Sequence, residues 1–220
     1  MLKRRRCIGT CAYMGGVMSL PEPFVWSWTQ MVNYNTECTE GTGEYIHYDR
    51  ITSSYHAMAR NALAENFRGD WLLMLDTDHI FPPDLLFRLI NSMNKTQADL
   101  MVGLYQYKYP PYNPVMYVWN SNGNGPGFYN FRPYVSISDQ PFKVDASGAG
   151  CLLARRHVFK KIYDELREKP FDIESPFSED LSFFNRVRRL GFKAYCDPKI
   201  EFHHLGYKPV TPFDYGKSEI

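Results

Sequence analysis

The chain has 220 residues, of which 44% are hydrophobic and 22% charged, and its formal net charge at pH 7 is +1. This length suits one domain with a substantial core, and the composition excludes an intrinsically disordered chain. The small net charge gives no bulk electrostatic support for binding nucleic acid or an anionic membrane. No run of about 18 apolar residues occurs, so we expect no transmembrane helix.

The N-terminus carries a basic run, Lys3–Arg6, followed by a mildly apolar stretch. These are the first two parts of a signal peptide, but Gly9, Tyr13 and Gly15 interrupt the apolar stretch. We therefore favour a first strand, with a signal peptide as the alternative. The five cysteines are odd in number and show no C-x-x-C spacing, which fits a reducing compartment. We expect a cytoplasmic protein.

Strands and helices are predicted to alternate along the first half of the chain. Apolar residues at three- and four-residue spacing from Ile51 to Phe67 predict an amphipathic helix that ends at Gly69. The next segment, Trp71–Leu75, is continuously apolar, as expected for a strand buried on both faces of a parallel sheet. The other elements predicted here are strands at 7–11, 45–48 and 100–105, and helices at 23–34 and from Pro82 through Ile90.

The second half of the chain begins with a change of composition. Residues 106–141 are rich in Pro, Gly, Asn, Tyr and Phe and contain only short strand candidates such as Val115–Trp119. We interpret this region as a long functional loop or a small β excursion. The remaining predicted elements are a strand-like stretch at 144–154 around a flexible Ser147–Gly150, helices at 157–168 and 178–190, and strands at 192–196 and 200–203.

This order of elements predicts a single α/β domain with a Rossmann-like, mostly parallel sheet, flanking helices and a small β or loop excursion. We divide the chain into a nucleotide-binding half of about residues 1–105, an acceptor-binding half of about residues 106–206, and a tail of residues 207–220. Ligands of such sheets bind beyond the carboxyl ends of the strands, which is where Asp76 and Asp78 lie.

The strongest chemical signal is the run Asp76-Thr77-Asp78 directly after the buried strand. Side-chain direction in a strand repeats every second residue, so the two carboxylates can point the same way. Two close carboxylates repel unless a cation lies between them, and Mg²⁺ and Mn²⁺ prefer such oxygen ligands and also neutralise a diphosphate. A D-x-D alone is commonly a solvated turn. Its place between a buried strand and a helix strengthens the prediction of a metal site.

Four further segments follow in a characteristic order: 144–153 (VDASGAGCLL), 178–183 (SEDLSF), 196–198 (CDP) and 203–206 (HHLG). Together with the strand-DTD-helix segment, they resemble GT-A-fold glycosyltransferases, most closely the family-2-like group, over about residues 7–206. The resemblance implies transfer of a sugar from a nucleotide-sugar donor, UDP-linked by family frequency, to a glycan or other hydroxyl acceptor. It also implies Mn²⁺ or Mg²⁺ as cofactor.

The resemblance also implies a metal set of Asp76, Asp78 and His204. On this resemblance Asp78 is expected to bind the metal directly, and Asp76 to contact the ribose or to reach the metal through water. His204, in the family's His-x-Gly position, is expected to complete the metal shell, with the adjacent His203 as the alternative. The ordinary role of either histidine is that of a hydrogen-bonded residue at a strand end.

Further donor contacts are implied for residues on three other segments. Arg60 is expected to face the diphosphate or the base, where an arginine fork suits phosphate oxygens, with a solvated helix-face residue as the alternative. Thr10 and Tyr13, at the end of the first strand, are candidates for the base and ribose or are ordinary loop residues. Gly148 and Gly150 are expected to let the backbone approach the donor sugar closely, or they form an ordinary tight turn. The predicted donor-binding residues are Thr10, Tyr13, Arg60, Asp76, Thr77, Asp78, Gly148 and Gly150.

The pair Glu179-Asp180 occupies the acidic position on the acceptor side of the family's site. In inverting members an acid there removes the proton of the acceptor hydroxyl. We choose Asp180 as the base and Glu179 as the second candidate, and we expect an inverting enzyme. Acids in the first turn of a helix are also favoured by the helix dipole without any catalytic role. Aromatic residues of the second half are expected to stack on sugar rings: Tyr107, Tyr112, Trp119 and Tyr129.

Two other functions stay open. A sugar-phosphate nucleotidyltransferase would require a Gly-rich basic loop near the N-terminus, but Gly15-Gly16 has no basic neighbour. A non-catalytic glycan- or nucleotide-binding domain on the same fold would not require the intact DTD and Glu-Asp motifs. We expect no nucleic-acid partner, because basic residues are scattered after Arg6. The last motif lies close to the end of the chain, which is consistent with fusion to further transferase domains.

Overall fold

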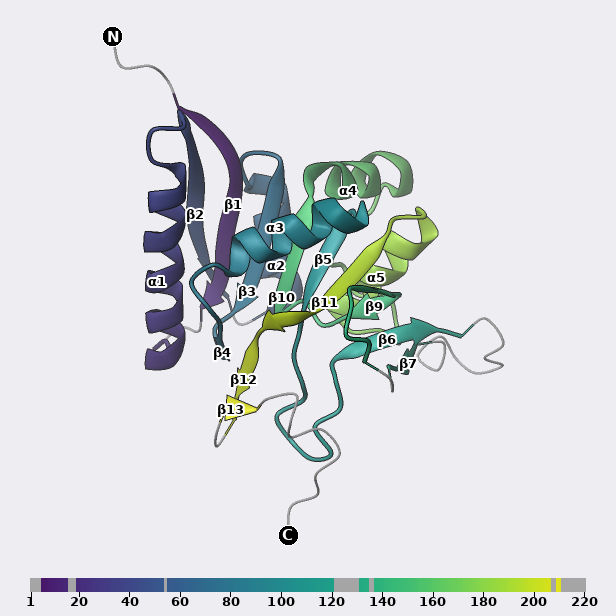
Figure 1. Ribbon diagram of the computed structural model, residues 1–220. Helices are drawn as coiled ribbons and strands as arrows, with labels where there is room; N and C mark the ends of the chain where they lie inside the picture. Colours follow the sequence, from purple (N-terminus) through teal and green to yellow (C-terminus); the bar gives the residue numbers. More distant parts are fainter. Residues whose placement is uncertain are drawn as a thin grey trace.

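A seven-stranded mixed sheet forms the centre of the protein in a computed structural model, which describes residues 5–15, 19–53, 55–120, 131–134, 137–206 and 209–210 (Figure 1). The strand order is β2-β1-β3-β10-β5-β11-β8. Its strands are β1 (Arg6–Gly15), β2 (Glu44–Thr52), β3 (Trp71–Asp76), β5 (Leu100–Leu104), β8 (Phe142–Val144), β10 (Cys151–Arg155) and β11 (Ala194–Glu201).

Five of the seven strands in this sheet point in the same direction. β1 is parallel to both β2 and β3, and β11 is parallel to β5. β10 lies between β3 and β5 and is antiparallel to both, and β8 is antiparallel to β11. The predicted mostly parallel α/β sheet is therefore confirmed. The reversed direction of β10 was not predicted, because a strand buried on both faces shows the same apolar run in either direction.

Helices cover both faces of the sheet. One face packs against α1 (Glu22–Thr39) and α3 (Leu85–Thr96), and the other against α2 (His56–Asn66), α4 (Arg156–Lys161) and α5 (Glu179–Arg189). In β3, Leu72 and Met74 belong to the α2 side, whereas Leu73 and Leu75 belong to the α1 side. All four side chains are fully buried, which is why this strand is apolar at every position.

Within the described part of the chain, no helix combines the length and apolarity that a membrane crossing requires.

Several element boundaries differ from the predictions. β1 continues to Gly15, and β2 continues to Thr52, so the helix predicted from Ile51 begins only at His56. Ile51 fits the apolar spacing of that helix, but it pairs with Met14 in the parallel β1–β2 ladder. Tertiary pairing thus overrides a local periodicity that favours a helix.

The predictions for the second half also need correction. The helix predicted at 157–168 is divided into α4 and a π-helical turn, η2 (Ile162–Leu166). The strands predicted at 192–196 and 200–203 overlap one longer strand, β11, whose pairing with β5 shifts register between Asp197 and Glu201. A separate strand, β12 (His203–Leu205), follows it.

Two small sheets lie at the lower edge of the main sheet in Figure 1. The first contains β4 (His79–Ile80), β12 and β13 (Pro209–Val210), and it pairs His79 with His204. The second contains β6 (Met116–Trp119), β7 (Phe131–Pro133) and β9 (Ala146–Ser147). Of these, β6 and β7 belong to the β excursion predicted at 106–141, and β9 belongs to the strand-like stretch predicted at 144–154. The segment just after the DTD run is therefore tied to the C-terminal part of the chain.

The turn between β9 and β10 packs tightly against Tyr105. A Cβ atom added to Gly148 would lie 2.1 Å from the Tyr105 hydroxyl oxygen, and one added to Gly150 would lie 3.1 Å from it. The Gly150 amide donates a hydrogen bond to the same oxygen at 3.2 Å. These glycines therefore permit close approach to the protein's own tyrosine. Their predicted approach to a donor sugar stays a prediction.

The substitution Gly148→Ala should lower the free energy of unfolding by about 1–3 kcal/mol, because the methyl group overlaps a packed oxygen atom. The loss should be smaller in a Tyr105→Phe background, which lacks that oxygen. Urea unfolding of the four proteins measures both effects. Gly15→Ala is the control, since its Cβ would make only ordinary contacts at 3.5 Å. Equal losses in both backgrounds would contradict the proposed overlap.

Candidate donor and metal site

A pocket of about 230 Å³ lies at the carboxyl ends of β1 and β3. β1 contributes Met14 and Gly15, and the end of β3 contributes Asp76, Thr77 and Asp78. The ladder pairs Met14 with Asp76, so the two strands end at the same level. Ser53 and His56 complete the lining. The DTD run thus borders a pocket at the sheet edge where the sequence predicted a ligand.

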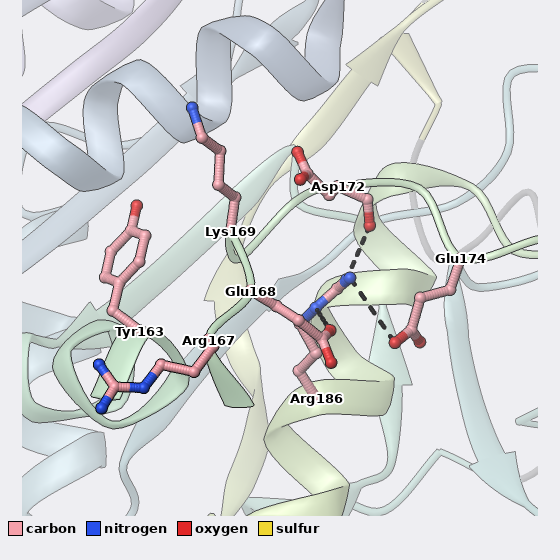
Figure 2. Close-up of a pocket in the computed structure, with 7 residues that line it drawn as sticks. All are labelled: Tyr163, Arg167, Glu168, Lys169, Asp172, Glu174 and Arg186. Atoms are coloured by element: carbon pink, nitrogen blue, oxygen red, sulfur yellow. Dashed lines mark hydrogen bonds and ion pairs between the residues drawn. The ribbon is translucent and has the colours of Figure 1, made fainter. Parts of the chain in front are cut away.

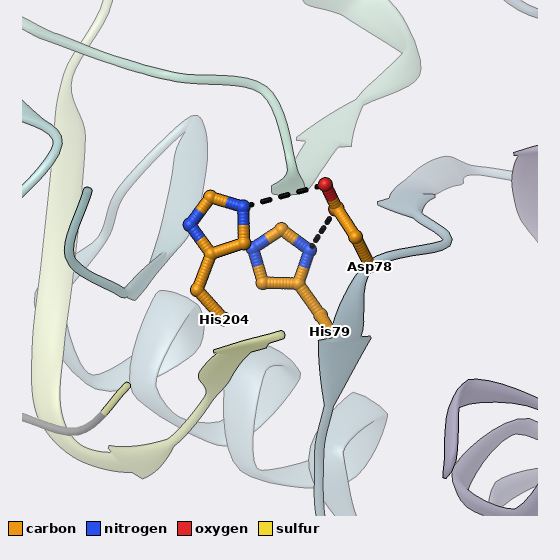
Figure 3. A group of neighbouring side chains, drawn as sticks. All are labelled: Asp78, His79 and His204. Carbon is orange, nitrogen blue, oxygen red and sulfur yellow. Dashed lines mark hydrogen bonds and ion pairs between the residues drawn. The ribbon is translucent and has the colours of Figure 1, made fainter. Parts of the chain in front are cut away.

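Asp78 lies beside two histidines and a lysine (Figure 3 shows the histidines). Its Oδ2 atom is 3.4 Å from Nε2 of His204 and accepts a hydrogen bond from Nζ of Lys108 at 2.5 Å. Its Oδ1 atom is 3.0 Å from Nδ1 of His79. Burial alone would raise the pKa of Asp78, but the contacts with His204, His79 and Lys108 hold that pKa well below its usual range. The carboxylate is therefore charged and available to a cation.

The backbone carbonyl of Gln106 sets the orientation of the His204 ring. Nδ1 of His204 donates to this carbonyl at 2.8 Å, since a carbonyl oxygen can only accept. Nε2 faces Asp78: when it carries a proton it donates to the carboxylate, and in the neutral ring it carries a lone pair there. Two electron-pair donors that face each other at 3.4 Å are stabilised by a cation between them. The structure brings His204 to Asp78, and the alternation along β12 directs His203 to the opposite side.

His79 is a third candidate ligand, which the sequence analysis missed. Its ring is 1% exposed and stacks on that of His204, with centroids 4.4 Å apart and planes at 6°. The contact with Asp78 lacks hydrogen-bond geometry, so both ring nitrogens are left without a hydrogen-bond partner. Burial lowers the pKa of His79 and favours the neutral ring, the form that binds metals. The ligand atoms of Asp78, His79 and His204 lie within 4.8 Å of one another, and this donor set fits a divalent metal.

Asp76, predicted as a member of the metal set, contacts Arg60 instead. Nη2 of the almost fully buried Arg60 is 3.1 Å from Oδ1 of Asp76, and Nη1 donates to the carbonyl of Ala149 at 2.8 Å. Nε lies 3.6 Å from Oε1 of Glu179. Burial alone would lower the pKa of Arg60, but the charges of Asp76, Asp180 and Glu179 raise it overall. The guanidinium predicted to face the diphosphate or the base is therefore directed at protein groups.

The two acids at the start of α5 have different partners. Glu179 lies 3.6 Å from Nδ1 of His56, which lines the strand-end pocket. Oδ1 of Asp180 accepts hydrogen bonds from the Ser178 hydroxyl and, at 2.8 Å, from the Leu181 amide. Glu179 thus lies beside Arg60 and beside a residue of the pocket, whereas Asp180 acts on Arg60 through its charge. Which of the two acids acts as a base stays a prediction.

Thr10 does not border the pocket. It is fully buried, and its hydroxyl donates to the Arg68 carbonyl at 2.9 Å and accepts from the Arg68 amide at 2.8 Å. It precedes Met14 by four residues, which is about 13 Å along a strand. The end of β1 at Met14 and Gly15, rather than Thr10, therefore faces the space where a donor would bind.

The aromatic candidates are divided between packing and surface positions. The ring of Tyr13 packs edge-on against Phe24 and Trp28, with centroids 5.2 and 4.8 Å away. Trp119 lies under the guanidinium of Arg188, with 3.8 Å between the carbon Cζ and the ring centroid. Tyr107 is exposed and its hydroxyl contacts that of Tyr117, Tyr112 is half-buried, and Tyr129 lies outside the described residues. The contact of Tyr13 with the base or ribose, and the stacking of the other four residues on sugars, stay predictions.

A larger pocket, of about 620 Å³, lies between η2, the loop after it and α5 (Figure 2). Its centre is the buried side chain of Arg186, whose Nε is 2.6 Å from Glu168 and whose Nη1 donates to the carbonyl of Asp172 at 2.7 Å. Nη2 lies 3.6 Å from Glu174. A ligand would have to displace these pairs. We therefore interpret Arg186 as an anchor that holds α5 against the loop, and not as a binding residue.

Comparisons with known proteins agree with the fold. The sequence model of glycosyl transferase family 2 matches residues 36–163, more than half of the chain. The crystal structure of A197 from STIV is similar with a TM-score of 0.61 and 15% identity, and the match covers 96% of this chain and 95% of that one. The crystal structure of GalNAc-T7 with UDP, GalNAc and Mn²⁺ is similar with a TM-score of 0.57 and 11% identity, and the match covers 90% of this chain and 43% of that one. No curated protein matches the sequence.

At these identities the two structures establish the fold and nothing further. The present chain spans less than half of the GalNAc-T7 chain. The fold that the sequence motifs indicated, GT-A with a single α/β domain, is confirmed.

The substitution Arg60→Gln should lower the free energy of unfolding by about 3 kcal/mol, because Asp76 and Glu179 lose a buried counter-charge. Chemical denaturation measures the loss. Arg88→Gln is a matched control: it removes an arginine from an exposed pair with Asp84, and it should cost less than about 1 kcal/mol. Similar small costs at both positions would show that Arg60 does not hold the site together.

Proposed function

The chain belongs to glycosyl transferase family 2, and on that premise we propose that it moves a sugar from a nucleotide-sugar donor to a hydroxyl acceptor at the pocket beside Asp76–Asp78. The observation that carries the proposal is the convergence of Asp78, His79 and His204 at the end of β3. UDP is the nucleotide we propose, and a glycan is the proposed acceptor. The determination of GalNAc-T7, a protein of the same fold, with UDP and Mn²⁺ supports this choice.

Asp78 and His204 are the residues proposed to hold a divalent metal, Mn²⁺ or Mg²⁺, with His79 as the third member of the group. When bound, such an ion would stabilise the negative charge that develops on the departing nucleoside diphosphate. Asp76 is not proposed as a direct ligand, because Arg60 holds its carboxylate. Asp76 and Thr77 line the pocket and are proposed to contact the donor's ribose and phosphates.

Asp180 is the proposed general base. Glu179 is paired with Arg60 and His56, which leaves Asp180 as the acid with fewer charged partners. The hydrogen bonds from Ser178 and Leu181 both reach Oδ1 of Asp180, so Oδ2 is the atom proposed to accept the proton of the acceptor hydroxyl. That hydroxyl oxygen would then attack the anomeric carbon of the sugar with inversion. In this scheme about residues 1–105 form the nucleotide-binding half, and about residues 106–206 form the acceptor-binding half and also supply His204 to the metal.

The substitution Asp78→Ala should remove Mn²⁺-dependent release of nucleoside diphosphate, measured with UDP-, GDP- and dTDP-linked sugars with Mn²⁺ or with a chelator. Asp164→Ala, which removes an acid from an i,i+4 surface pair with Lys160, is the control and should keep full activity. Full Mn²⁺-dependent activity in Asp78→Ala would show the metal assignment to be wrong.

The substitution Asp180→Asn should keep the thermal shift that the donor produces and reduce turnover by about 10²–10⁴-fold, because the amide cannot accept the proton. Glu179→Gln is the comparison that separates the two acids. If Glu179→Gln loses turnover and Asp180→Asn does not, Glu179 is the base and the present assignment is reversed.

A further inference from the structure

Lys108 lies where its charge balances that of Asp78. Its Nζ atom is 2.5 Å from Oδ2 of Asp78, the same oxygen that lies 3.4 Å from Nε2 of His204. The side chain of Lys108 is 31% exposed, so the pair is partly shielded from water. The ammonium group therefore lies against the carboxylate oxygen that a metal held by Asp78 and His204 would share.

The backbone brings Lys108 to this place. The amide of Tyr107 donates to the carbonyl of Asn113, and the amide of Val115 to the carbonyl of Tyr105, both at 2.9 Å. These bonds close residues 105–115 into a compact loop whose base is fixed. The carbonyl of Gln106, two residues before Lys108, is the group that orients His204. One short segment thus sets both the histidine and the ammonium group at Asp78.

The charges of the site explain why this lysine matters. Arg60 is already shared between Asp76 and Glu179, so it does not balance the charge of Asp78. Lys108 supplies that charge. A divalent cation and an ammonium group cannot share one carboxylate oxygen without strong repulsion, because like charges a few ångströms apart repel in a partly shielded site. Metal binding at Asp78 and the Lys108–Asp78 pair therefore exclude each other.

We propose that Lys108 is an internal cation that holds Asp78 in the metal-free protein, leaves it when the metal binds, and then contacts the donor diphosphate. This rests on the proposed function, which places the metal at Asp78. Diphosphate oxygens are ordinary ligands of Mn²⁺ and Mg²⁺ in such sites. An ammonium group released from Asp78 is then within reach of those oxygens, and lysine binds phosphate as a point charge.

Mn²⁺ alone tests the first step. Lys108→Met keeps much of the aliphatic stem and removes the charge, so this variant should bind Mn²⁺ about fivefold more tightly than the wild type. Electron paramagnetic resonance, which detects the free Mn²⁺ in a titration, measures the two affinities. Lys108→Arg keeps the charge and should stay near the wild-type affinity. The control is Lys143→Met, at an exposed lysine whose Nζ lies 4.0 Å from a carboxylate oxygen of Asp145, and it should bind Mn²⁺ like the wild type. Unchanged or weaker Mn²⁺ binding by folded Lys108→Met overturns the competition.

Inorganic pyrophosphate, which carries a diphosphate without a base or a sugar, tests the second step. At saturating Mn²⁺, Lys108→Met should bind pyrophosphate about fivefold more weakly than the wild type by calorimetry, because one ammonium contact is lost. Equal affinities would overturn the diphosphate contact.

The outcomes separate this inference from the proposed function. If Asp78→Ala abolishes Mn²⁺ binding but Lys108→Met leaves it unchanged, only the inference fails. If neither the wild type nor Lys108→Met binds Mn²⁺, the proposed metal site fails and the inference fails with it.

Discussion

A buried guanidinium requires a counter-charge, and this requirement at Arg60 organises the site. Arg60 reaches from α2 to Asp76 at the end of β3, to the carbonyl of Ala149 in the turn before β10, and to Glu179 at the start of α5. An unpaired charge at this depth would be strongly destabilising, so each partner must stay within reach. Four segments that are distant in the sequence are thereby held around one pocket.

The same constraint separates the two carboxylates of the DTD run. Asp76 is bound to Arg60, whereas Asp78 lies among His204, His79 and Lys108. The sequence pattern treats the two acids as equivalent, since residues two apart in a strand point the same way. Their partners make them different: Asp76 supports the fold of the site, and Asp78 is the carboxylate at which we propose that a lysine exchanges for a metal. This division underlies both the proposed function and the role inferred for Lys108.

The sequence was informative where the signal is local. The continuous apolar run of β3 and the acids after it located a strand inside the sheet and the edge of the pocket correctly. Features that depend on contacts distant in the sequence were not predictable: His79 becomes a candidate ligand only because β4 pairs with β12, more than 120 residues later. Thr10 was predicted at the end of the first strand, but β1 continues past Cys11 to Gly15. An apolar run alone does not mark the end of a strand.

The central claim is that Asp78 and His204 bind a divalent metal, and electron spin-echo spectroscopy of bound Mn²⁺ tests it most directly, because the method detects histidine nitrogens that ligate the ion. We expect nitrogen modulation in the wild type, the same modulation in His203→Ala, and its reduction or loss in His204→Ala. Absence of nitrogen modulation in the wild type, or its loss in His203→Ala instead, would contradict the account.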